Sequence, residues 1–206
     1  MSLVAGFLTD KYVCFCGDTC LTLPNGNTST IQKVHYFNQN ILWAFTGDVQ
    51  SNVIPIKEFL ANGYFDFTKT SNVSFNTLND KLKKHYNALY ASLLKSNQNA
   101  SVKKYPQFNT MIAGIENGAF TIYRYSLIEK VQSCEKYVED SSCVQHIIMG
   151  KQEHEKNLCM PIFYPTISDL SQTFQNVLDK GVIFDKSINN MQQYVFLQKG
   201  NCNVNK

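Results

Sequence analysis

The sequence predicts an α+β fold in which two stacked β-sheets lie between helical layers, a four-layer αββα sandwich. The chain has two strand-rich halves, and an amphipathic helix follows each half. Because a sheet and an amphipathic helix must each bury an apolar face, this order favours stacked layers. A length of 206 residues fits one domain, residues 1–206, with enough chain to bury a core.

The first predicted element is a β-hairpin over residues 2–18. Residues 3–8 form an apolar run that is typical of a buried strand, and residues 9–11 make the turn. The return strand ends at Asp18. The hairpin therefore ends on a carboxylate.

A polar loop over residues 23–30 separates this hairpin from a second pair of strands, at 31–37 and 41–46. A helix is expected next, but Pro55 removes a backbone donor and would kink a helix that ran through it. The helix is therefore either bent, or short and confined to residues 55–61.

The second half begins with a loop or insertion over residues 62–74. Apolar residues then recur at three- and four-residue steps from Leu78 to Leu93. This spacing predicts an amphipathic helix of about 20 residues, capped by Asn76. Residues 95–106 are expected to form a linker.

Five further elements are predicted after the linker. Strands at 108–115 and 119–125 flank an Asn-Gly turn signature. A strand at 144–149 precedes a second helix over 165–181, whose last glycine is a C-terminal stop signal. Residues 193–198 form the last strand.

The composition argues against several classes of function. The net charge is +3 and the basic residues are scattered, so no nucleic-acid stripe or membrane patch is expected. No segment reaches the ~18 apolar residues of a membrane span. Seven cysteines without a secretory leader predict reduced thiols and a cytoplasmic location.

Metal and cofactor motifs are not found in the sequence. Cys14 and Cys16 alternate with Phe15 on a predicted strand, so they are interpreted as small core residues rather than as metal ligands with Cys20 and His35. The sequence has no glycine-rich phosphate loop. We therefore expect no metal and no cofactor.

Ser2 is the candidate nucleophile. If Met1 is removed, as a small second residue normally permits, Ser2 carries a hydroxyl and a free amine. An α-amine titrates near neutrality and can accept the Oγ proton, which makes the serine an activated nucleophile. A disordered start is the alternative, but the apolar run that follows favours a terminus held within the fold.

Four positions in order resemble one known family. They are Ser2, Gly17-Asp18, Gln32-Lys33-Val34 and the segment 44–47, which ends in Gly47. This pattern resembles the N-terminal half of the proteasome β-type and bacterial HslV-like peptidases, which are N-terminal nucleophile (Ntn) hydrolases of the threonine-peptidase class. The resemblance covers about residues 1–60 and implies the αββα sandwich of the Ntn type.

The resemblance implies a catalytic role for each matched residue. Lys33 would lower the pKa of the terminal amine and help to transfer the proton, and Asp18 would keep the lysine charged and oriented. The backbone N–H of Gly47 would bind the oxyanion. Ser2 would then cleave peptide bonds through an acyl-enzyme.

The same resemblance implies the substrate and the partners. The pocket for the residue before the cleaved bond would be lined by apolar side chains, those of Leu21, Ile31, Phe45 and Val49. Peptides or unfolded proteins would be cut after hydrophobic residues. Family members assemble into homo-oligomers and work with a partner ATPase.

The chain departs from the family pattern at several positions. Serine replaces the leading threonine, and Lys151 follows Gly150 where the family commonly has serine. The family's late Asp-x-x-Ser pair has only imperfect counterparts at Asp185 to Ser187 and in the following residues. Two alternatives therefore stay open: a non-catalytic structural relative, and a small-molecule amidase of the same fold class.

Overall fold

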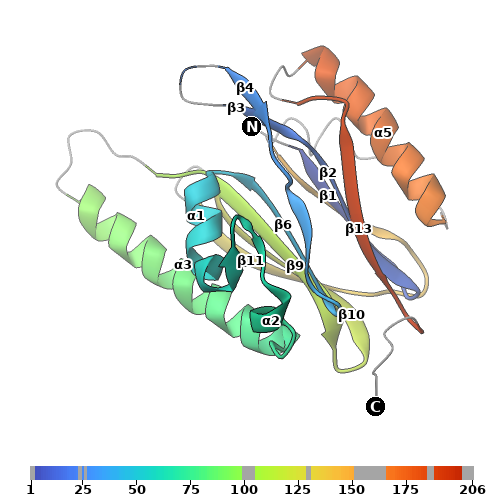
Figure 1. Cartoon of the computed structure of the whole chain (residues 1–206), viewed down its shortest axis with the longest axis horizontal. Helices are drawn as coiled ribbons and strands as arrows, with labels where there is room; N and C mark the ends of the chain where they lie inside the picture. Colours follow the sequence, from blue (N-terminus) through green and yellow to red (C-terminus); the bar gives the residue numbers. More distant parts are fainter. Residues whose placement is uncertain are drawn as a thin grey trace.

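Two antiparallel β-sheets form the centre of the computed structural model (Figure 1). The structure describes residues 3–22, 25, 27–98, 105–128, 131–150, 166–184 and 188–200. Helices are few and lie outside the two sheets. The predicted α+β class is confirmed.

The first sheet has the strand order β12-β1-β2-β13. Its strands are β1 (Val4–Leu8), β2 (Tyr12–Asp18), β12 (Gln145–Met149) and β13 (Gln192–Gln198). Both faces of β1 and β2 are buried, which explains their nearly continuous apolar sequence. The predicted N-terminal hairpin and the two later strands agree with these bounds.

The second sheet has the order β11-β10-β9-β6-β5. Its strands are β5 (Val34–Asn38), β6 (Ile41–Gly47), β9 (Phe108–Glu116), β10 (Ala119–Ile128) and β11 (Val131–Val138). Asn117 and Gly118 have φ of 52° and 81°, as the Asn-Gly hairpin signature predicts. Strand β11 was not predicted, because its residues are mostly partly or fully exposed.

Several short elements between residues 20 and 70 were not predicted from the sequence. Strands β3 (Cys20–Thr22) and β4 (Thr28–Thr30) pair with each other, as do β7 (Leu60–Ala61) and β8 (Tyr64–Phe65). Helix α2 covers Phe67–Thr70. The predictions of a polar loop over residues 23–30 and of a loop or insertion over residues 62–74 were wrong where β4, β8 and α2 lie.

Pro55 ends an α-helix instead of bending one. Helix α1 covers Val49–Val53, and a 3₁₀ helix, η1, covers Ile54–Phe59 with the proline in its first turn. A proline is tolerated there because the first N–H groups of a helix have no partner within it.

The two long helices are close to their predicted positions. Helix α3 covers Phe75–Asn97 and is capped by Ser74, whose Oγ accepts the Thr77 N–H, so the predicted Asn76 cap was wrong. Helix α5 covers Ile167–Phe184 and continues through Gly181, which therefore is not a stop. None of the helices in the described ranges is long and apolar enough to cross a membrane.

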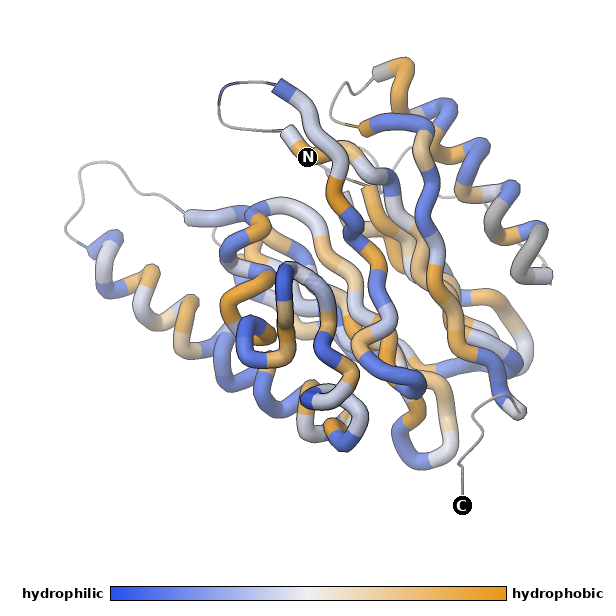
Figure 2. The backbone as a smooth tube through the Cα atoms, in the orientation of Figure 1, coloured by the Kyte–Doolittle hydropathy of each residue, from blue (hydrophilic) through white to orange (hydrophobic). Residues whose placement is uncertain are grey.

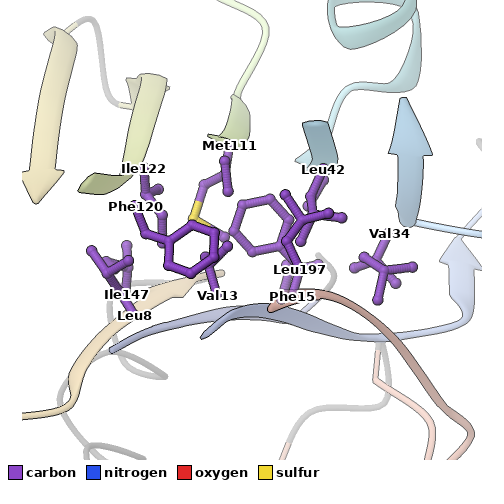
Figure 3. Packing of buried hydrophobic residues seen from close by; sticks show 14 of the residues in the cluster. Leu8, Val13, Phe15, Val34, Leu42, Met111, Phe120, Ile122, Ile147 and Leu197 are labelled. Atoms are coloured by element: carbon purple, nitrogen blue, oxygen red, sulfur yellow. The ribbon is translucent and has the colours of Figure 1, made fainter. Parts of the chain in front are cut away.

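Three apolar clusters join these elements. The first contains residues of both sheets, including Phe15 and Met111, whose side chains meet between the sheets (Figure 3). The second joins β6, β9 and β10 to α3, and the third joins β1, β2 and β12 to α5. Both helices alternate apolar and polar positions along their length, as one-sided burial requires (Figure 2).

Candidate active site

Asp18 and Lys33 form an ion pair in the interior. Asp18 ends β2 of the first sheet, and Lys33 immediately precedes β5 of the second sheet. The Lys33 Nζ lies 2.7 Å from Asp18 Oδ1, and the side chains are 1% and 0% exposed. The structure therefore brings together two of the residues that the sequence analysis proposed for the site.

The Asp18 carboxylate also holds the start of the chain. Its Oδ1 accepts the Leu3 N–H at 2.8 Å, and its Oδ2 accepts the Cys20 N–H at 2.9 Å. The Asp18 N–H donates in turn to the Leu3 carbonyl at 3.0 Å. The peptide of Leu3, the residue bonded to Ser2, is therefore fixed against the Asp18–Lys33 pair.

The protonation of Lys33 responds to this environment. Burial lowers the pKa of the ammonium from its ordinary value, and the Asp18 carboxylate opposes that effect in part. A lysine with a lowered pKa releases and accepts a proton more readily near neutrality. The position is therefore suited to proton transfer as well as to electrostatic stabilisation.

Gln193 supports the segment that carries Lys33. From β13, its Oε1 accepts the Lys33 N–H at 2.9 Å, and its Nε2 donates to the Ile31 carbonyl at 3.3 Å. Nearby, Asn189 Nδ2 donates to Thr19 Oγ1 at 2.9 Å. The sequence analysis missed both residues, because a separation of about 160 residues leaves no local pattern to detect.

Gly47 ends β6 in a conformation that requires glycine. Its φ is +80°, and a Cβ there would lie 2.2 Å from the Gln107 carbonyl oxygen. The following Asp48 N–H donates to that same oxygen at 2.8 Å. The backbone therefore turns sharply here, with no room for a side chain.

Three of the four predicted pocket residues line one cavity. Ile31, Phe45 and Val49 border a cavity of about 330 Å³, whereas Leu21 lies in β3 opposite Ser29 and does not line it. The β7–β8 hairpin also borders the cavity. The sequence analysis missed this hairpin, whose residues it divided between a possible short helix over 55–61 and a loop or insertion over 62–74.

His35 lies in the cavity wall among aromatic rings. Its ring centroid is 5.2 Å from that of Trp43, 5.6 Å from that of Phe65 and 6.4 Å from that of Phe45. Burial lowers the pKa of His35 to about 4, so the ring is neutral near pH 7. The cavity therefore presents an apolar, uncharged wall at this position.

The cysteines of β2 belong to the core. Cys14 and Cys16 are buried in the cluster that contains α5, with their Sγ atoms 3.6 Å apart. The hydrogen bond with Cys14 and burial both raise the pKa of Cys16. Within the described ranges, no group of three or more metal-ligating side chains could hold a metal ion.

The predicted nucleophile, Ser2, lies outside the described residues. So do Lys151, Asp185 and Ser187, the positions at which the chain departs from the family pattern or matches it only imperfectly. The site is therefore described through three features of the described residues: the ion pair, the glycine turn and the cavity.

Solved structures with a similar fold are Anbu (ancestral beta-subunit) proteins. The Anbu from Yersinia bercovieri is 12% identical, with a TM-score of 0.63 over 96% of this chain and 82% of that one. The helical assembly of the Anbu complex from Pseudomonas aeruginosa is 10% identical, with a TM-score of 0.64 over 96% and 81%. An Anbu (Gly-1) mutant from Hyphomicrobium sp. strain MC1 is 11% identical, with a TM-score of 0.62 over 96% and 82%.

These comparisons define the fold and correct the family assignment. No family model matches the sequence, and no curated protein matches it. The assignment to the proteasome β-type and HslV-like family was wrong, because the similar structures are Anbu proteins, which are proteasome-like but a distinct family. At 10–12% identity the likeness shows a proteasome-like subunit fold.

Proposed function

We propose that this chain is an N-terminal nucleophile hydrolase that cleaves peptide bonds through an acyl-enzyme on Ser2. The observation that carries this proposal is the buried Lys33–Asp18 pair, hydrogen-bonded to the N–H of Leu3. Burying two charges costs more free energy than an apolar pair of the same size would. A catalytic role for the pair accounts for that cost.

The reaction is acyl transfer. After removal of Met1, the Ser2 amine accepts the Oγ proton while Oγ bonds to the substrate carbonyl carbon. The C–N bond then breaks, and the proton passes to the departing amine. A water activated by the same Ser2 amine hydrolyses the resulting ester and restores the enzyme.

Lys33 and Gly47 assist this reaction in different ways. In this mechanism the Lys33 ammonium lowers the pKa of the terminal amine, because two neighbouring cations disfavour each other's charged form. The Gly47 N–H donates to the oxyanion, a contact of a kind that contributes about 3 kcal/mol to transition-state stabilisation. The absence of a side chain at Gly47 lets the substrate backbone approach.

The cavity bordered by the β7–β8 hairpin would take the side chain before the cleaved bond. Ile31, Phe45 and Val49 supply apolar surface, and His35 is neutral near pH 7. A charged side chain would lose its hydration there without gaining a partner. The substrate is therefore a peptide or unfolded protein with a hydrophobic residue at this position.

We further propose a single domain with the four-layer αββα arrangement of Ntn hydrolases. The three apolar clusters support it, since they lie between the sheets and on the outer face of each sheet. Homo-oligomerisation is proposed by analogy with the Anbu complex of Pseudomonas aeruginosa, which forms a helical assembly. A partner ATPase and a cytoplasmic location stay predictions.

Intact-mass spectrometry with a peptide epoxyketone tests the function. This probe needs both a hydroxyl and a free amine on one residue, so an adduct on Met-trimmed protein would support Ser2 as nucleophile and base. The matched control is Ser2→Ala, which keeps a small second residue but has no hydroxyl and should give no adduct.

Retention of Met1 together with no adduct would reject the proposal in favour of the non-catalytic structural relative. Adduct formation without cleavage of any peptide would instead favour the small-molecule amidase. A panel of acyl amides, assayed beside peptide substrates, separates these two results.

A further inference from the structure

The turn at Gly47 is held on both sides by one buried amide. Asn52 in α1 donates through Nδ2 to the Thr46 carbonyl at 3.0 Å and to the Asp48 carbonyl at 2.8 Å. The two carbonyls belong to the residues before and after Gly47. Asn52 is 0% exposed, so water does not compete for these bonds.

A second pair of buried groups orients Asn52. The Thr110 hydroxyl in β9 donates to Asn52 Oδ1. Because that hydroxyl proton is used, the Tyr86 hydroxyl in α3 must donate to Thr110 Oγ1, at 2.8 Å. Both side chains are buried as well.

Every group in this chain of hydrogen bonds has a fixed direction. Peptide carbonyls only accept, so both protons of the Asn52 amide must point at Thr46 and Asp48. Its oxygen must then face Thr110. The hydrogen bonds therefore all donate in one direction, from Tyr86 to Thr110, from Thr110 to Asn52 and from Asn52 to the turn.

This direction determines where the Gly47 N–H points. The Thr46 carbonyl and the Gly47 N–H belong to one planar trans peptide, in which the C=O and N–H bonds point in opposite directions. A carbonyl held towards Asn52 therefore turns the Gly47 N–H away from Asn52. The N–H of Phe45, two residues earlier, points to the same side of β6 as the Gly47 N–H, and it donates to the Lys33 carbonyl at 3.0 Å. The Gly47 N–H therefore points to the side of β6 on which Lys33 lies, opposite Asn52.

We propose that Asn52 is a positioning residue for catalysis, oriented by Thr110 and Tyr86, and that it aims the Gly47 N–H at the developing oxyanion. This role rests on the proposed hydrolase function. An oxyanion donor stabilises the transition state only if it is directed there before the reaction begins. The buried chain of hydrogen bonds supplies that orientation without touching the substrate.

The test compares Thr110→Val with Thr110→Ser in the full-length protein. Valine has the shape of threonine but no hydroxyl, whereas serine keeps the donor. Acylation of Ser2 by a β-lactone is measured at several probe concentrations, which separates binding from the chemical step. Thr121→Val is the matched control, since Thr121 is also buried in the second sheet but donates only a long 3.4 Å bond to Ala119.

We expect Thr110→Val to slow the chemical step by about tenfold or more while binding changes less than about twofold. Thr110→Ser and Thr121→Val should stay within about twofold of wild type, and Tyr86→Phe should show a smaller loss than Thr110→Val. Equal acylation rates in Thr110→Val and Thr110→Ser would overturn the proposal.

Amide hydrogen exchange over residues 46–48 gives a readout that does not need activity. Exchange should be faster in Thr110→Val than in Thr110→Ser, because valine cannot donate the hydrogen bond that orients Asn52 against the turn. If wild type is not acylated at all, the hydrolase function fails and exchange alone decides the role of Asn52 in holding the turn. Unchanged exchange would then overturn the positioning role. If Thr110→Val does not fold, Tyr86→Phe is measured in the same two assays.

Discussion

The Lys33 ammonium and the Asp18 carboxylate lie 2.7 Å apart with neither side chain more than 1% exposed. Such a pair depends on both partners, because removing one leaves the other charge buried without compensation. The same carboxylate oxygen also accepts the Leu3 N–H. Changes at either residue therefore affect stability and the start of the chain together.

We expect Lys33→Met and Asp18→Asn each to lower the free energy of unfolding by about 3–5 kcal/mol, because each leaves one unpaired buried charge. The double variant carries neither charge and should lose less than the sum of the two single effects. Urea unfolding of all four proteins measures this coupling. Additive losses would contradict a direct interaction between the two charges.

The same variants separate stability from catalysis. The double variant should recover part of the stability but none of the reaction with the epoxyketone, since the proposed chemistry needs the ammonium. Restored adduct formation in the double variant would show that Lys33 contributes only to folding.

Gly47→Ala should destabilise the protein more than the matched change Gly118→Ala. Both glycines have φ near +80°, so both variants suffer the backbone cost of about 1–2 kcal/mol. Only at Gly47 would the new Cβ also collide with a backbone oxygen, whereas nothing lies within 4 Å of a Cβ at Gly118. Urea midpoints measure the difference, and acylation should slow by about tenfold or more only in Gly47→Ala. Equal losses at the two positions would contradict this account.

Much of the fold could be predicted because its signals are local. The hairpin around Asn117 and Gly118 follows from the turn residues, and α3 follows from the spacing of its apolar side chains. Strand β11 escaped prediction because its surface is largely exposed and its alternation of apolar and polar residues is weak. Local patterns therefore identify buried elements better than edge strands.

The site was only partly predictable, for a related reason. The ion pair was anticipated from matched positions in one short segment, and its two partners are 15 residues apart. Gln193 and Asn52 each act through two hydrogen bonds to backbone groups, and such contacts leave no periodic pattern in the sequence. The family assignment rested on four matched positions, which were too few to distinguish one proteasome-like family from another, and no family model matches the sequence.

Val49→Glu should change which peptides are cleaved. Wild type should prefer leucine or tyrosine over arginine before the cleaved bond, because the cavity wall is apolar. A carboxylate at the partly exposed position 49 would stabilise a bound arginine side chain by about 1 kcal/mol. The ratio of kcat/KM for arginine to kcat/KM for leucine should therefore rise about fivefold. The matched control is Gln50→Glu, which adds the same charge on an exposed neighbour that does not line the cavity. Equal cleavage after arginine and leucine by wild type would contradict the apolar pocket.

His35 should make the protein less stable as the pH falls below about 6.5. The pKa of its ring is lowered from 6.5 to about 4 by burial beside Trp43 and Phe65, so the folded state favours the neutral ring. Below the unfolded value the unfolded chain binds the proton more readily, and stability falls as the pH drops from about 6.5 to about 4. Since the ring is partly exposed, we expect a loss of about 1–3 kcal/mol across this window.

The variant His35→Phe isolates this contribution, because it keeps an aromatic ring in the cavity wall but cannot bind a proton. Carboxylates titrate in both proteins, so the relevant quantity is the difference between their urea-unfolding free energies at about pH 7 and about pH 4.5. Wild type should lose more stability than His35→Phe over that interval. Parallel losses in the two proteins would mean that His35 is protonated as easily in the folded state as in the unfolded state, and that the cavity wall is open to water at this ring.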